Sequence, residues 1–486
     1  MSDATIARAK IAARLAEIVL VAGGIVCLLA FFYFVYWYVW THEREFTGAA
    51  GIVMGIVLPG VLASALFASL RLRPAYRVGL AIFCISLLFS VYGLELLLLA
   101  LQKFGPHFDA RTRLEVVAHL RNRGIDAVPA VFPSALWDQR GGSVKSAISV
   151  NSSEVLPLGG IAKKLTVMCN ESGEWITYRS DEHGFNNPEG IWQSRDISVA
   201  AVGDSFAFGA CVPADKNFVA LIRGRYPATL NLGINGAGPL VELAAVKEFL
   251  PVFRPKATLW FYLELNDQSD LNYEKRSGLL LRYLKDNFNQ GLITRQTEID
   301  QVLTQYVDTK RKQAGAKTVH EYLNYGLNII KLSTVRTKLG LVYGTSKVEE
   351  SFESDELQIK LFREILQNAR AFVNSWNGML YFVYLPAWQR YTSPQSASDN
   401  RDAILALVRG LNIPIIDIHQ AFQAHGDPLR LFPFRQLGHY NEEGHRLVAE
   451  TVLRYFSSHS SPCELPASGS PDCLVHDRYP HAQRAQ

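Results

Sequence analysis

The chain has 486 residues, of which 49% are hydrophobic and 19% are charged, and its formal net charge is +4. That length exceeds one ordinary domain, so we expect two or three structural units. The small net charge, without any long run of Lys or Arg, argues against a protein built to bind nucleic acid.

Apolar residues are concentrated in the first 103 positions. Three segments there, at about residues 18–40, 46–70 and 78–102, are almost free of charge, and each is long enough to cross a hydrocarbon core of about 30 Å. A cleaved signal peptide is the alternative for the first segment, but its apolar run is too long and two more segments follow. We therefore predict a membrane anchor, residues 1–103, with three transmembrane helices.

Basic residues indicate the orientation of this anchor. They precede the first segment and join the second to the third, whereas the loop 41–45 has one Arg balanced by acids. The positive-inside rule then places the N-terminus in the cytoplasm. Three spans would deliver everything after Lys103 to the outside, so we predict a multi-pass membrane protein. In a bacterium this means the inner membrane, with the N-terminus in the cytoplasm and the part after Lys103 in the periplasm.

The cysteines agree with an extracytoplasmic location. Four of them, Cys169, Cys211, Cys463 and Cys473, would lie in an oxidising compartment, where disulfides form. Cys463 and Cys473 bracket a loop rich in Pro, Ser and Gly and can pair. Four unrelated thiols is the alternative, because spacing does not determine connectivity.

Residues 104–195 form a lead-in segment of mixed α+β character. Helical spacing runs from Arg111 to Arg123, and short β-like runs follow, divided by turns that contain Gly and Asn.

From residue 196 to 457 the pattern alternates between strand and helix. Buried strand runs are predicted at 197–202, 229–232, 257–265, 379–385 and 414–418. Strands spaced by helices predict an α/β domain in which a five-stranded parallel sheet has helices on both faces. In such sheets the site lies at the carboxyl ends of the strands.

A polar, helical insertion at 268–356 interrupts the alternation. It begins at the expected active-site edge, which favours a lid or a substrate wall; a spacer packed elsewhere is the alternative. Residues 458–486 are rich in Ser and Pro, so we expect a flexible C-terminal tail.

Four short blocks in this domain together predict acyl-transfer chemistry. Ser205, Gly236 and Asn266 each follow a predicted strand, and His439 lies on the loop after the last strand. A serine hydroxyl needs a base to take its proton, which His439 can do. The developing oxyanion needs donors, which the N–H groups of Ser205 and Gly236 and the Asn266 amide can supply.

The four blocks resemble the SGNH (GDSL-type) hydrolase family in order and spacing. They are Gly203-Asp204-Ser205-Phe206, Asn231-Leu232-Gly233-Ile234-Asn235-Gly236, Asn266-Asp267 and Gly438-His439-Tyr440-Asn441. The resemblance covers residues 196–457 without the insertion. It implies a flavodoxin-like fold and the activity of esterases, lipases, or carbohydrate O-acyltransferases and deacetylases. The phrase Ser180-Asp181-Glu182-His183-Gly184-Phe185 also resembles membrane-anchored bacterial members of the family.

The chain departs from the family at one position. Members of the family usually carry an Asp two or three residues before the catalytic His, where this chain has Leu437 and Gln436. We expect Gln436, a backbone carbonyl, or an acid from elsewhere such as Asp417 to orient the imidazole, unless hydrolysis has been lost. His445, in the helical run after His439, is expected on the helix surface.

The sequence therefore predicts a membrane-anchored periplasmic serine esterase or O-acyltransferase that acts on acyl groups, above all acetyl, of an envelope or exported polysaccharide. Expected partners are the acylated glycan or another ester, the bilayer, and membrane proteins of a polysaccharide export or modification system. No metal or organic cofactor is expected. The alternative is a catalytically degenerate SGNH domain that binds glycan or assists envelope assembly. A carboxylate within about 3 Å of His439 would favour the enzyme.

Overall fold

The computed structural model describes residues 3–40, 53–104, 109, 111–140, 142–194, 196–264, 266–285, 288–316, 356–392 and 394–459, with the isolated positions 329, 332 and 335. The chain forms two compact units. One comprises residues 1–106 and 316–353, and the other comprises residues 107–315 and 354–486. The insertion predicted at 268–356 is thus shared between the two units.

The described residues 3–40 and 53–104 of the first unit are largely helical, with α1 (Asp3–Trp40), the π-helical turn η2 (Val53–Val57), α3 (Leu58–Ser69) and α4 (Pro74–Phe104). Within the described residues, two of its stretches, Ala7–Tyr36 and Pro74–Ala100, are long and apolar enough to cross a membrane. The prediction of three such spans is therefore wrong for this part of the chain. The described part of the middle segment contains a shorter apolar helix, Gly55–Ser69, which at about 1.5 Å per residue falls short of a 30 Å core.

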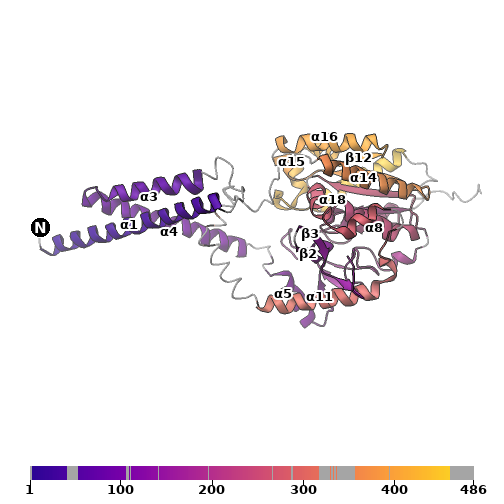
Figure 1. Ribbon diagram of the computed structural model, residues 1–486, viewed down its shortest axis with the longest axis horizontal. Coiled ribbons are helices and arrows are strands. Elements are labelled where there is room, and N and C mark those ends of the chain that lie inside the picture. Colours follow the sequence, from indigo (N-terminus) through magenta and orange to yellow (C-terminus); the bar gives the residue numbers. More distant parts are fainter. Residues whose placement is uncertain are drawn as a thin grey trace, which may run out of the picture. The chain divides into compact units, whose positions relative to one another are not determined.

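The second unit is built on a five-stranded, wholly parallel sheet with the strand order β12-β11-β10-β8-β9. Figure 1 draws this unit as a ribbon, with β12 labelled. The five strands are β8 (Val199–Gly203), β9 (Thr229–Gly233), β10 (Ala257–Leu263), β11 (Met379–Leu385) and β12 (Ile415–Asp417). The prediction of this sheet is confirmed. Its order, second-first-third-fourth-fifth along the chain, is that of flavodoxin-like sheets, in which ligands bind where the order reverses.

Alternate residues of these strands pack on opposite faces of the sheet, as the two-residue period of a strand requires. Val202 and Trp260 join the core under α8 (Pro239–Phe249), α14 (Glu356–Asn374) and α16 (Pro394–Gly410). Ala201 and Phe261 join the core under α7 (Phe218–Arg225), α17 (Ile418–Ala424) and α18 (Glu442–His459). The helices of the sheet domain are α6 (Ser205–Phe208), α7 (Phe218–Arg225), α8 (Pro239–Phe249), α14 (Glu356–Asn374), α15 (Gln389–Thr392), α16 (Pro394–Gly410), α17 (Ile418–Ala424) and α18 (Glu442–His459).

The lead-in segment belongs to the same compact unit as the sheet. Its helix α5 begins with a capping box, in which the Thr112 side chain and the Glu115 side chain each bond the other residue's backbone N–H. Leu136 and Phe185 of this segment are buried in the core beside α8. Its elements are α5 (Arg113–Asn122), β1 (Ala127–Pro129), η3 (Pro133–Leu136), β2 (Trp137–Arg140), β3 (Ser143–Ser146), β4 (Ser149–Val150), β5 (Ser153–Glu154), β6 (Leu165–Val167), β7 (Thr177–Arg179) and η4 (Ile191–Gln193).

The first part of the insertion packs against the lead-in segment. The Ala162 N–H donates to Asp300, the Leu156 N–H donates to Gln290, and the Tyr306 hydroxyl donates to the Ala135 carbonyl. This part is therefore a packed wall and not a free lid. It consists of α9 (Asn266–Glu274), α10 (Gly278–Leu281), η6 (Arg282–Leu284), η7 (Leu292–Thr294) and α11 (Gln296–Ala316).

Candidate active site

Ser205 stands at the carboxyl end of a central strand. Strand β8 ends at Gly203, and Ser205 is the first residue of the short helix α6. Asp204 caps this helix, because its Oδ1 accepts the Phe206 N–H at 2.9 Å. The Ser205 side chain thus lies at the switch point of the sheet, fixed by the tight turn from strand to helix.

His439 contacts the serine hydroxyl directly. Its Nε2 lies 2.8 Å from Ser205 Oγ, which is hydrogen-bond distance for proton transfer. The ring also packs on Phe206, with 4.8 Å between the ring centroids. The structure therefore brings together the two residues that the sequence proposes as nucleophile and base, 234 positions apart.

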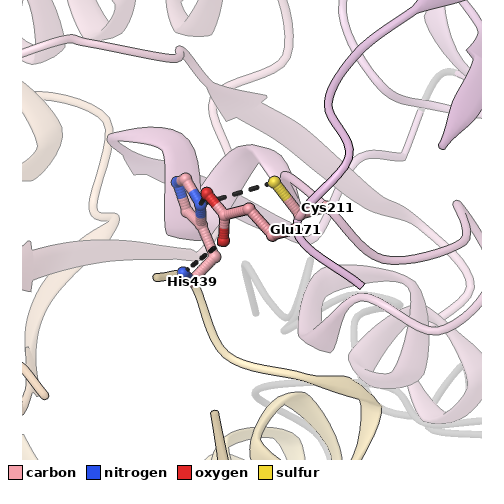
Figure 2. Close-up of side chains that lie close together, drawn as sticks. All are labelled: Glu171, Cys211 and His439. Atoms are coloured by element: carbon pink, nitrogen blue, oxygen red, sulfur yellow. Dashed lines mark hydrogen bonds and ion pairs between the residues drawn. The ribbon is translucent and has the colours of Figure 1, made fainter. Parts of the chain in front are cut away.

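A carboxylate from the lead-in segment holds the other side of the imidazole (Figure 2). Glu171 lies in the loop between β6 and β7; its Oε1 is 2.8 Å from His439 Nδ1, and its Oε2 accepts the His439 backbone N–H at 2.7 Å. Burial alone would raise the pKa of Glu171, but the hydrogen bonds and charge of His439 outweigh it and lower the pKa below its ordinary value. An ionised Glu171 fixes the tautomer that leaves Nε2 free to take the serine proton.

The two side chains predicted to orient His439 lie elsewhere. Asp417 caps α17 by accepting the His419 N–H and forms an ion pair with Arg401. Gln436 is exposed to solvent. The carboxylate that contacts His439 Nδ1 comes instead from Glu171, 268 residues earlier in the chain.

A disulfide joins the Glu171 loop to the region after the nucleophile. Cys169, two residues before Glu171, is bonded to Cys211, which follows helix α6. The Cys211 sulfur lies 3.5 Å from His439 Nδ1. A dashed line marks this contact in Figure 2. The possible pair Cys463–Cys473 lies outside the described residues.

The expected oxyanion donors follow the two strands that flank β8. Gly203 is in register with Gly233 of β9 and with Phe261 of β10, so the chain leaves all three strands at one edge of the sheet. Gly236 lies in the turn after β9, and Asn266 begins α9 after β10. The Asn266 Nδ2 donates to Asp204 Oδ2 at 2.9 Å; an amide has two N–H donors, so one stays available for a ligand.

Gly236 has a backbone conformation that only glycine adopts readily. Its φ is +69°, and a Cβ built there would lie 2.5 Å from Ser134 Oγ.

We expect Gly236→Ala to displace the N–H and lower kcat for ester cleavage by about 10²–10³, the usual effect of losing one oxyanion donor. Gly224→Ala is the matched control, because a Cβ there meets nothing within 4 Å and activity should be retained. Equal kcat values for both variants, measured with a small chromogenic ester, would remove Gly236 from the oxyanion site.

Two other buried carboxyl groups near the site, those of Asp204 and Asp267, accept hydrogen bonds from backbone N–H groups. Burial raises the pKa of Asp204 to about 6 although the Phe206 N–H, the His439 charge and the Asn266 amide favour its ionised form. Burial, followed by repulsion from Glu242, raises the pKa of Asp267 well above its usual range. Asp267 Oδ2 accepts the Leu263 N–H, so both aspartates act on the turns that carry Ser205 and Asn266.

His445 differs from the expectation of a surface residue. It is fully buried, its Nδ1 accepts the Phe218 N–H at 3.2 Å, and burial lowers its pKa to about 3. A neutral imidazole here joins α18 to α7 beneath the sheet. It is a core histidine and not a second base.

One group of metal-type donors occurs in the part of the chain that the structure describes, and it consists of Glu171, Cys211 and His439. The Cys211 sulfur is in a disulfide and cannot act as a thiolate ligand. The two remaining donors, Glu171 and His439, are already hydrogen-bonded to each other. The donor set therefore suits a proton-transfer triad and not a metal.

No family model and no curated protein sequence matches the chain. Solved structures similar to it include a member of the lipolytic protein G-D-S-L family from Veillonella parvula DSM 2008 (12% identity, 54% of this chain and 98% of that chain, TM-score 0.28). The lipase/acylhydrolase from Enterococcus faecalis is similar at 12% identity, over 54% of this chain and 96% of that chain, with a TM-score of 0.29. A two-domain esterase active on acetylated mannans is similar at 11% identity, over 55% of this chain and 50% of that chain, with a TM-score of 0.30. At these TM-scores the likenesses carry no argument for the function, which depends on the geometry of the site.

Proposed function

We propose that the protein is a serine esterase or O-acyltransferase with Ser205 as nucleophile. The observation that carries this proposal is the continuous hydrogen-bonded chain Ser205–His439–Glu171, with 2.8 Å at each of its two links. A carboxylate within reach of the base was the feature that would separate an enzyme from a degenerate binding domain, and it favours the enzyme.

The reaction proceeds through an acyl-enzyme. Ser205 Oγ attacks the acyl carbonyl while His439 Nε2 takes its proton, and Glu171 stabilises the imidazolium that forms. The N–H groups of Ser205 and Gly236 and the Asn266 amide hold the oxyanion. The imidazolium then protonates the departing alcohol, and water or a sugar hydroxyl resolves the acyl-enzyme. Hydrolase and transferase share every residue named here and differ only in the second acceptor.

We place the site outside the cytoplasm of a bacterium, on a membrane-anchored chain. The disulfide Cys169–Cys211 supports an oxidising compartment, and the two long apolar helices are consistent with a membrane anchor. The proposed substrate is an acyl group, above all acetyl, on an envelope or exported glycan, as the resemblance of the motifs implies. Membrane proteins of polysaccharide export or modification are the proposed partners.

A fluorophosphonate probe tests the activated serine in the detergent-solubilised full chain. We expect labelling of the wild type and of Ser458→Ala, a control on the exposed face of α18, and no labelling of Ser205→Ala or His439→Ala. Absence of labelling in folded wild-type protein would favour the alternative, a domain that binds glycan without cleaving it.

A further inference from the structure

The structure holds a second feature outside the triad, a cleft between the lead-in segment and the insertion. The cleft has a volume of about 670 Å³. The lead-in contributes residues of β3 and β5, and the insertion contributes α10 with the residues around it. Three cations, Lys145, Arg276 and Arg282, line the cleft, against the single acid Glu154.

The cations of this cleft have no carboxylate partner within the residues that the structure describes. Both guanidinium groups lie over aromatic rings, Arg276 at 5.0 Å from the Tyr273 centroid and Arg282 at 3.8 Å from the Phe288 centroid. The Arg276 Nε is buried without a hydrogen-bond acceptor in this part of the chain. Leaving this donor buried without an acceptor has a free-energy cost.

Glu154 offsets only one of the three positive charges in the cleft lining. Its Oε1 already accepts the Ser146 N–H at 2.7 Å, which fixes the carboxylate on the β3 backbone. Lys145, which precedes Ser146 in β3, has an exposed side chain. The lining therefore keeps a positive charge, with two guanidinium groups pre-oriented by their rings for planar, bidentate recognition of an oxyanion.

Two elements run from the oxyanion site to this cleft and set the distance between them. Helix α9 runs from Asn266 to Glu274, which at about 1.5 Å per residue is roughly 12 Å, and Arg276 follows in the turn two residues after its end. On the other side, Ser134 lies beside Gly236. The β2–β3 hairpin starts three residues later, and in its strand register Lys145 of β3 lies opposite Asp138 of β2. A small ester cannot span this distance, whereas a polymer can.

We propose that this cationic cleft is a distal subsite for an anionic group, a carboxylate or a phosphate, carried by a polymeric glycan whose acyl ester lies at Ser205. This inference rests on the proposed function and narrows its substrate class to acidic glycans. The cleft contributes binding of the chain remote from the reacting bond and leaves the chemical step to the triad.

The test compares KM and kcat of the full-length protein for three esters: an O-acetylated polyuronate, an O-acetylated neutral mannan, and 4-nitrophenyl acetate. Arg276→Gln, Arg282→Gln and Lys145→Gln should each raise KM for the polyuronate about tenfold, because a charge-assisted hydrogen bond is lost, and leave kcat unchanged. Values for the neutral mannan and the small ester should not change. Arg276→Lys, which keeps the charge, should recover part of the loss.

The matched control is Arg311→Gln, which removes one exposed positive charge on α11 outside the cleft lining and should leave all three substrates unaffected. Equal changes for acidic and neutral substrates, or no change with the polyuronate, would overturn the subsite.

A binding measurement separates this proposal from the proposed function. De-esterified polyuronate and inorganic polyphosphate are titrated by calorimetry into Ser205→Ala, which needs no activity. Binding of polyuronate that weakens in Arg276→Gln and Arg282→Gln supports the subsite even if no ester is cleaved, and the tighter of the two ligands identifies the anion. Absence of binding by both would refute the subsite and leave the esterase proposal standing.

Discussion

Glu171→Gln should lower kcat for ester cleavage by about 10⁴ without unfolding the protein. The carboxylate accepts from both the Nδ1 and the backbone N–H of His439, at 2.8 and 2.7 Å. A Gln amide cannot hold the same tautomer and cannot stabilise the imidazolium, and loss of the third member of a triad has a cost of this size. Steady-state kinetics with a small ester give kcat, and circular dichroism gives the folded fraction.

The same loop offers a matched control for this variant. Glu174 is exposed three residues after Glu171, so Glu174→Gln makes the same chemical change without touching His439. We expect Glu174→Gln and Gln436→Ala to keep wild-type kcat, and Glu171→Asp, which keeps the charge at a longer distance, to retain more activity than Glu171→Gln. A Glu171→Gln protein with wild-type kcat would show that His439 is oriented without this carboxylate.

Loss of the disulfide should affect both stability and turnover. The sequence separation between Cys169 and Cys211 is 42 residues, for which the chain-entropy model gives a stabilisation of about 4 kcal/mol. The bond also ties the Glu171 loop to the segment after Ser205, and Cys211 itself has a left-handed φ of 65°. Without the disulfide, the backbone at Cys211 is free to relax. The Glu171 carboxylate is then no longer held against His439, so kcat should fall.

Reduction and mutation together test this expectation. A dithiol reductant converts the disulfide to two thiols and is itself oxidised to a cyclic disulfide. It should lower the urea midpoint and kcat of the wild type and have no such effect on Cys169→Ala/Cys211→Ala, which starts in the lowered state. An unchanged kcat after complete reduction, verified by thiol titration, would show that packing alone holds the Glu171 loop.

Local patterns were sufficient to predict the sheet. All five predicted strands appear within a few residues of their expected bounds, because a buried parallel strand is a short apolar run between turns and its neighbours are helices of regular period. The membrane segments were less predictable. Composition alone predicted three long spans, whereas the structure has a shorter helix at Gly55–Ser69.

The places of Ser205 and His439 in the fold were predictable from the sequence for the same local reason. Ser205 comes two residues after the end of β8, and His439 comes three residues before the start of α18, so the position of each follows from a neighbouring element. What only the tertiary structure decided is the third member of the triad. Glu171 and the cysteine two residues before it lie in a loop of the lead-in segment, and no periodicity connects that loop to His439, 268 residues later. Their meeting depends on how the lead-in packs on the sheet, which is a property of the folded core and not of any local run of residues.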